Sequence, residues 1–255
     1  MTTPLLATRD LSINFGGLLA VHNLNLEVAM SEVHAIIGPN GAGKTSLINL
    51  LSGDLKPTHG QVFHRGEDIT GFPPYRVSAR GIGRSYQITN IFLEFPCRQN
   101  CWLAARARGG SAMRFVMPAE IDKDTAEGTD KALAMTNLTD LANIPAQAMS
   151  YGEQRQLEIA MLLALEPEIL LLDEPLAGLG GNESQAVIDL IRRLALDHGI
   201  VLIEHDMDAV FAIADRLTVM VNGEMLESGT PEMIRASENV RQAYLGDELD
   251  LETRA

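Results

Sequence analysis

A glycine-rich segment at residues 38–45 constrains the fold more than any other part of the chain. It joins an apolar run, Val33–Ile37, to a segment with helical spacing, Thr45–Leu51. Two glycines separated by four residues and followed by Lys44 and Thr45 predict a phosphate-binding loop, because glycine lets successive N–H groups turn towards a phosphate at a helix N-terminus. Lys44 is expected to neutralise the β and γ oxygens of a nucleotide, and the Thr45 hydroxyl to bind Mg²⁺. An ordinary glycine turn would explain neither side chain. The predicted phosphate-binding residues are Gly38, Pro39, Asn40, Gly41, Ala42, Gly43, Lys44 and Thr45.

Two carboxylates follow a second apolar run. Ile169–Leu172 predicts a buried strand, and Asp173 and Glu174 come at its carboxyl end, where open α/β sheets bind ligands. We expect Asp173 to hold Mg²⁺ and Glu174 to polarise an attacking water, while Pro175 ends the strand. Taken alone, the pattern would also fit an acidic turn after a strand. The phosphate-binding loop in the same chain favours the catalytic interpretation.

The remaining pattern predicts an α/β protein with an inserted helical segment. Alternating apolar and polar residues over 11–15 and 24–28 predict a small antiparallel sheet. Short apolar runs at Ile169–Leu172 and Ile200–Ile203, separated by an amphipathic helix, predict a parallel sheet covered by helices. The predicted limits are residues 1–90 and 153–246 for the core with its antiparallel subdomain, 91–152 for a helical subdomain, and 247–255 for an acidic tail.

The composition argues against several classes of protein. The net charge of -14 disfavours nucleic acid and anionic membrane surfaces as partners. Cys97 and Cys101 are too few for a disulfide framework or a zinc site, so we expect free thiols in a reducing compartment. Neither a signal peptide nor a run of about 20 apolar residues is found. We expect a cytoplasmic protein that reaches the inner face of the cell membrane only through partner subunits.

A segment upstream of Asp173 resembles a family motif. Met149–Glu158 is similar to the signature motif of ATP-binding-cassette (ABC) ATPases in its Ser-x-Gly-x-Gln form. In that family the motif lies at a helix start and caps the γ-phosphate of ATP bound by the opposite subunit. The resemblance therefore implies that Ser150, Gly152 and Glu153 bind nucleotide across a dimer. Ser150 and Glu153 would also form an ordinary capping box, and the two interpretations are compatible.

Three further roles are implied by the resemblance alone. Gln87 falls where the family has the glutamine that contacts Mg²⁺ and links the core to the helical subdomain, although by itself it is an unremarkable polar residue. His205 matches the switch histidine that contacts the γ-phosphate, although a lone histidine at a strand end is more often structural. Phe15 matches the aromatic residue that stacks on adenine, with a sheet-core residue as the alternative. The predicted catalytic residues are Glu174, His205, Lys44 and Gln87, and the predicted metal ligands are Thr45, Gln87 and Asp173.

The resemblance extends from about Leu5 to Gly246 and implies a P-loop NTPase (RecA-like) core with a mixed sheet, a small antiparallel β subdomain and an inserted α-helical subdomain. Segments such as Arg84–Gln87 and Glu227–Pro231 are similar to importer ATPases for branched-chain amino acids, amides and urea. The implied cofactors are ATP and Mg²⁺. The implied partners are a second ATPase subunit, integral membrane permease subunits and, indirectly, a periplasmic solute-binding protein, with no nucleic acid.

These features predict the ATP-binding and ATP-hydrolysing subunit of an ABC importer that works as one half of a dimer. The first alternative is a soluble ABC-type ATPase acting in translation or repair, although such proteins usually carry two cassettes or a coiled-coil insertion. A phosphate-loop kinase would leave the signature segment unexplained, and a regulatory module would not need an intact site. The sequence leaves open the solute and whether the second subunit is identical or related. Gly180-Gly181 lacks the family's usual carboxylate or serine, which leaves open how the two sites are coupled.

Overall fold

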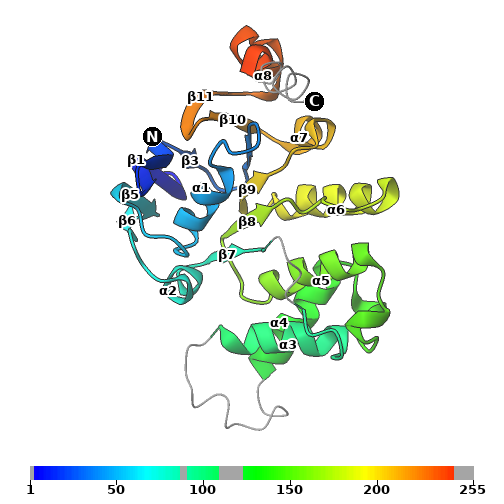
Figure 1. Cartoon of the computed structure of the whole chain (residues 1–255). Helices are drawn as coiled ribbons and strands as arrows, with labels where there is room; N and C mark the ends of the chain where they lie inside the picture. Colours follow the sequence, from blue (N-terminus) through cyan, green and yellow to red (C-terminus); the bar gives the residue numbers. More distant parts are fainter. Residues whose placement is uncertain (1–2, 87–90, 109–122, 244–255) are drawn as a thin grey trace.

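The computed structural model describes residues 3–86, 91–108 and 123–243, which form two sheets and a helical lobe (Figure 1). The larger sheet has the strand order β11-β10-β4-β9-β8-β7, and the smaller has the order β2-β1-β5-β6 with β3 paired to β1. The strands are β1 Leu6–Phe15, β2 Leu18–Leu24, β3 Glu27–Val28, β4 Val33–Ile37, β5 His59–His64, β6 Glu67–Asp68, β7 Ile82–Arg84, β8 Ile169–Asp173, β9 Gly199–Ile203, β10 Arg216–Val221 and β11 Glu224–Gly229.

The larger sheet is mixed, as predicted. The neighbouring strands β7, β8, β9, β4 and β10 pair in parallel, in that order. Strand β11 pairs antiparallel to β10 through the Asn222-Gly223 turn. Every residue of β4, β8 and β9 is buried, because a parallel sheet covered on both faces needs apolar side chains on both.

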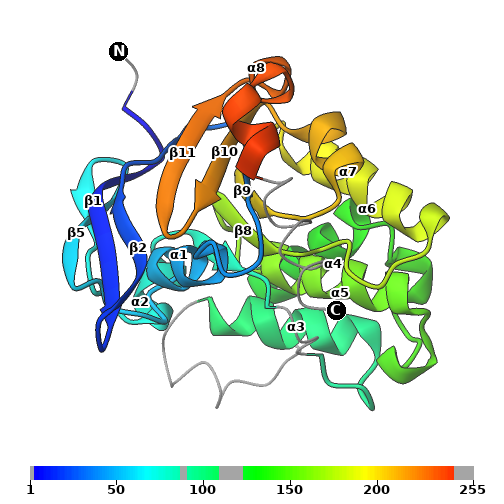
Figure 2. The ribbon, with the colours of Figure 1, turned by 45° about the horizontal axis from the view of Figure 1, so that its top comes forward.

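Alternate residues of these strands enter two different cores. Ala35 and Leu170 pack with the core under α6 (Gly181–Leu194), whereas Ile36 and Leu171 pack with the core shared by α1 (Lys44–Leu51) and the antiparallel sheet. Figure 2 shows this arrangement, with β1, β2 and β5 on one side of β8 and β9 and with α6 and α7 (Met207–Ile213) on the other. The sheet is thus held between two apolar layers.

The helical lobe contains α3, α4 and the start of α5, and it has a core of its own. Cys97, Cys101, Leu133, Leu138 and Leu157 are buried in it, and both thiols are free, as expected. The helices are α1 Lys44–Leu51, α2 Pro74–Ala79, α3 Cys97–Ala107, α4 Lys123–Met135, α5 Tyr151–Leu163, α6 Gly181–Leu194, α7 Met207–Ile213 and α8 Pro231–Ala236, with 3₁₀ turns at Thr139–Leu141 and Ala146–Ala148.

Helix α5 belongs to both the lobe and the core. Leu157 and Ala160 pack inside the lobe, whereas Ile159 and Leu163 pack against the central sheet. The predicted division between residues 152 and 153 falls inside this helix, and the domain limits stay a prediction. Across the three described ranges, none of the helices combines the length and apolar character that a membrane span requires.

Candidate active site

The segment 38–45 leaves β4 and enters α1, as the sequence predicts. Gly38 has φ 152° and Gly43 has φ 99°. A Cβ atom on Gly38 would lie 2.1 Å from the backbone oxygen of Met220, and one on Gly43 would lie 2.1 Å from that of Ala20. Glycine is needed at both positions because the loop passes this close to neighbouring backbone. As the N-cap of α1, Gly43 has no side chain to accept from the first-turn N–H groups, which leaves them to bind an anion.

A pocket of about 450 Å³ lies beside this loop. Phe15 at the end of β1 lines it, and the side chain is 47 % exposed, so it is not a residue of the sheet core. An exposed aromatic ring at the rim can stack on a planar base. Lys44 Nζ donates to the carbonyl oxygens of Gly38 at 2.6 Å and Pro39 at 3.0 Å, which keeps the ammonium over the loop. The lining residues are Phe15, Leu18, Leu19, Ala20, Asn40, Gly41, Ala42, Gly43, Lys44, Thr45, Ser46, Glu174 and Asn222.

Asp173 ends β8 with a fully buried carboxylate. Its Oδ2 lies 3.5 Å from Arg84 Nη2, whereas its Oδ1 has no hydrogen-bond partner. Burial raises the pKa of Asp173, and the Arg84 guanidinium opposes that rise. A buried carboxylate oxygen without a partner is costly, so it is a candidate for a ligand that the protein alone does not supply.

The oxygen chemistry fits magnesium. The unpartnered Asp173 Oδ1 and the Thr45 hydroxyl are hard oxygen donors of the kind that Mg²⁺ prefers. In the part of the chain that the structure describes, no group of three or more His, Cys, Asp or Glu side chains is placed to hold a metal ion. A magnesium ion here would need further oxygen ligands besides these two groups, and the third predicted ligand, Gln87, lies outside the described residues.

The two predicted hydrolytic residues are placed differently. Glu174 lines the pocket with the phosphate-binding loop, and its N–H donates to the carbonyl oxygen of Ile203 at 2.9 Å. His205 follows β9 but is not among the pocket-lining residues, and its side chain is 68 % exposed. Buried Glu204 accepts from the N–H groups of Leu176 at 2.7 Å and His205 at 3.2 Å, and burial raises the pKa of Glu204. Gln87 lies outside the described residues.

The signature segment forms the capping box that the sequence predicts. Ser150 is the N-cap of α5, its Oγ accepts from the Glu153 N–H at 3.2 Å, and Glu153 Oε2 accepts from the Ser150 N–H at 2.7 Å. The Gly152 N–H donates to Glu183 Oε1 at 3.3 Å, and the same carboxylate accepts from Gly180 through Oε2. None of the three signature residues lines the nucleotide pocket of their own chain. Glu183 also places a carboxylate beside the Gly180-Gly181 loop, a role that the sequence analysis does not assign.

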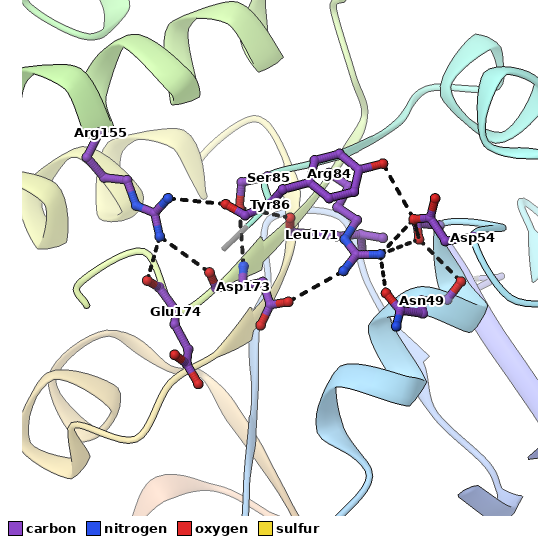
Figure 3. A network of polar contacts seen from close by, with 10 residues as sticks. Asn49, Asp54, Arg84, Ser85, Tyr86, Arg155, Leu171, Asp173 and Glu174 are labelled. Carbon is purple, nitrogen blue, oxygen red and sulfur yellow. Dashed lines mark hydrogen bonds and ion pairs between the residues drawn. The ribbon is translucent and has the colours of Figure 1, made fainter. Parts of the chain in front are cut away.

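Two arginines on either side of Asp173 have no role in the sequence analysis (Figure 3). Arg84 at the end of β7 contacts Asp173 and reaches Asn49 of α1 at 2.6 Å. Arg155 of α5 is 3 % exposed and donates to backbone carbonyls at the end of β8. The spacing of Arg155 and Glu158 suggests a pair on one helix face, but it does not reveal which backbone the arginine reaches.

The fold and this pocket define an ATP-binding cassette, and the comparisons with known proteins agree. The family model described as "ABC transporter" matches residues 21–177, so the chain belongs to the ABC transporter family. A second model, described as "Branched-chain amino acid ATP-binding cassette transporter", matches residues 224–250.

This chain is also similar to individual curated proteins and to solved structures. The high-affinity branched-chain amino acid transport ATP-binding protein LivG of Escherichia coli K12 is 40 % identical, covering 97 % of this chain and 100 % of its own. The corresponding Pseudomonas aeruginosa protein BraF is 39 % identical with the same coverage. The ADP conformation of the ATP-binding cassette MJ1267 superposes with a TM-score of 0.86 at 28 % identity, covering 96 % of this chain and 100 % of that one.

These findings confirm the predicted family, the predicted fold class and the predicted enzyme class, an ATPase. They give no support to the alternative of an ATPase acting in translation or repair. The roles of individual site residues stay predictions, to which the geometry above adds placement in the fold.

Proposed function

We propose that this chain drives the import of branched-chain amino acids as one of two ATPase subunits attached to a membrane permease. Relatives that cover nearly the whole chain are named for branched-chain amino acid transport, and a family model with that description matches residues 224–250. A dimer is proposed because the signature residues do not line the nucleotide pocket of their own chain. Phe15 and Glu174 line it with the phosphate-binding loop, whereas Ser150 and Gly152 do not, and these two residues would complete the pocket of the partner.

In this mechanism the phosphates of ATP lie against the N–H groups at the start of α1, with Lys44 neutralising the β and γ oxygens. Thr45, Gln87 and Asp173 would hold Mg²⁺, which offsets phosphate charge when bound. The Glu174 carboxylate accepts a proton from the water that attacks the γ-phosphorus, so ADP and phosphate are formed. His205 would contact the γ-phosphate and orient the water, and the region of Gln87 would link the site to the helical lobe.

Closure of the dimer is the step that performs work. Because the γ-phosphate is bound by both halves, ATP has a higher affinity for the closed arrangement than for the open one. Hydrolysis removes this difference, and the halves separate.

Contact with the permease would take place on the helical lobe. Phe92, Leu93 and Ile144 are exposed there, and Tyr86 is exposed at the end of the segment that leads to Gln87. Exposed apolar side chains gathered on one lobe favour binding to a protein partner. The protein would thus be peripheral on the cytoplasmic face of the membrane.

The test of the mechanism is Glu174→Gln, which keeps the shape of the side chain and removes the proton acceptor. We expect ATP binding to persist, turnover to fall by about 10²- to 10⁴-fold, and a dimer to accumulate with ATP in size-exclusion chromatography. Glu127→Gln, at an exposed position of α4, is the matched control with unchanged turnover. Full turnover in the Glu174→Gln protein would remove this residue from the mechanism.

The substrate class has a separate test. With permease and binding protein in proteoliposomes, we expect leucine, isoleucine or valine to stimulate ATP hydrolysis and urea to leave it unchanged. Stimulation by urea, with none by these amino acids, would contradict the proposed substrate while leaving the ATPase mechanism intact.

A further inference from the structure

Glu174 has a backbone conformation that L-residues rarely adopt. Its φ is 50°, in the left-handed region, although it is neither glycine nor asparagine. The following residue is Pro175, whose ring disfavours helical conformations at the position before it. Such a conformation persists only where surrounding groups hold it, and such positions are concentrated at functional sites.

Hydrogen bonds hold the backbone on both sides of this residue. The Glu174 N–H donates to the carbonyl oxygen of Ile203 in β9 at 2.9 Å. The Glu174 carbonyl oxygen accepts from Nη2 of Arg155 at 2.7 Å, the shortest of the bonds that Arg155 makes to backbone. The peptide group after Glu174 is therefore oriented by a side chain from a different element, α5.

Arg155 has five N–H groups, and the structure gives an acceptor for each. Besides Glu174, the guanidinium donates to the carbonyl oxygens of Asp173 at 3.5 Å and Pro175 at 3.2 Å, so three successive carbonyls converge on it. The remaining bonds go to the carbonyl oxygen of Tyr86 at 3.3 Å and to Glu158 Oε2 at 2.6 Å. The carboxylate of Glu158 compensates the buried charge of an arginine that is 3 % exposed.

The location of Arg155 links three parts of the catalytic machinery. It lies about one turn after Ser150 and Gly152 on the helix that begins with the signature segment. Its bond to Tyr86 reaches the residue directly before Gln87 (Figure 3). None of its hydrogen bonds goes to the phosphate-binding loop.

We propose that Arg155 is a positioning residue: it fixes the left-handed turn that presents the Glu174 carboxylate to the nucleotide pocket, and it ties that turn to the signature helix. The proposal rests on the catalytic role proposed for Glu174. A displacement of α5 relative to the sheet would be transmitted to Glu174 through this guanidinium. Lysine could not replace it fully, because an ammonium has three donors and no planar fork.

The experiment compares Arg155→Lys and Arg155→Gln with Leu163→Ala, all in the full chain reconstituted with its permease. Leu163 is 5 % exposed on the same helix, and its truncation lowers stability without touching the network. We expect the Arg155 variants to bind ATP within about twofold of wild type and to lose about 10- to 100-fold in kcat, because small displacements of reacting groups have effects of this size. Leu163→Ala should keep its kcat per folded molecule at temperatures below its melting transition.

A second measurement separates positioning from general loss of structure. In the Glu174→Gln background, adding Arg155→Lys should cause no further fall in the residual rate, because both changes disable the same carboxylate. Near-UV circular dichroism verifies that each protein is folded. One folded Arg155 variant is sufficient for the test, because its kcat alone supports or overturns the proposal.

A kcat within about twofold of wild type in a folded Arg155 variant would overturn the proposal, as would additive losses in the double variant. If Glu174→Gln itself kept full turnover, the proposed function of Glu174 would fail instead. The two failures are therefore distinguishable.

Discussion

Removal of the Arg84 charge tests how strongly the end of β8 is held to α1. Arg84 Nη1 donates to Asn49 at 2.6 Å, to Ser52 at 2.9 Å and to Asp54 at 2.7 Å, while Nη2 lies 3.5 Å from Asp173. Arg84→Met keeps most of the packed stem and removes all of these donors. The Asp173 side chain, 1 % exposed, is then left buried without the cation paired with it.

The magnitude follows from this geometry. At an effective dielectric constant of ~20, two unit charges 3.5 Å apart attract by about 5 kcal/mol. The hydrogen bonds to Asn49 and Ser52 contribute about 1 kcal/mol each. The Asp54 side chain is 30 % exposed, so solvent screens its share. Because removing one member of a buried pair typically costs about 3–5 kcal/mol, we expect Arg84→Met to lower the free energy of unfolding by that amount.

The assay is equilibrium unfolding in urea, followed by far-UV circular dichroism without nucleotide or magnesium. The matched control is Arg192→Met on α6, where the arginine is 48 % exposed and lies 3.3 Å from Asp189. Its expected loss is below about 1 kcal/mol, since exposed pairs contribute little. A loss for Arg84→Met no larger than that of the control would refute the reasoning.

Two other predictions concern the buried thiols and a close backbone contact of the phosphate-binding loop. Burial raises the pKa of the Cys97 thiol to about 11 and also raises the pKa of the Cys101 thiol. Neither thiol should therefore react with a disulfide reagent at pH 8 in the native protein, whereas both should react in urea. Labelling of either cysteine in the native protein would contradict this prediction. Gly43→Ala should lower the melting temperature and abolish ATP binding, because its Cβ would lie 2.1 Å from the backbone oxygen of Ala20. Gly128→Ala, in α4 with its nearest atom 4.0 Å away, is the control and should gain about 0.5–1 kcal/mol.

Part of the site could be predicted because its chemistry is encoded over a few neighbouring residues. The loop at residues 38–45 needs glycines beside a lysine and a threonine, and Asp173 and Glu174 follow an apolar strand directly. Short spacing of this kind leaves few alternatives once the flanking strand and helix are recognised. The capping box at Ser150 was predictable for the same reason.

Long-range contacts could not be predicted in this way. Arg155 and Tyr86 are separated by 69 positions, and Gly152 and Glu183 by 31, so no local pattern indicates that they meet. The exposure of Phe15 could be predicted only in part. The alternation of residues in β1 places Phe15 on the same face as Ile13, but it does not show whether other residues cover that face as far as Phe15.

The sequence, through its motifs and their resemblance to a known family, was thus sufficient to predict the family and the fold class, and it named the residues that are expected to bind phosphate. The left-handed turn at Glu174 and the guanidinium of Arg155 that holds it emerge only when β8, β9 and α5 pack together, and the exposure of Phe15 depends on where the layer that covers β1 ends. The physical reason is that a strained backbone conformation depends on hydrogen-bond partners from distant segments, and folding alone brings those segments within reach.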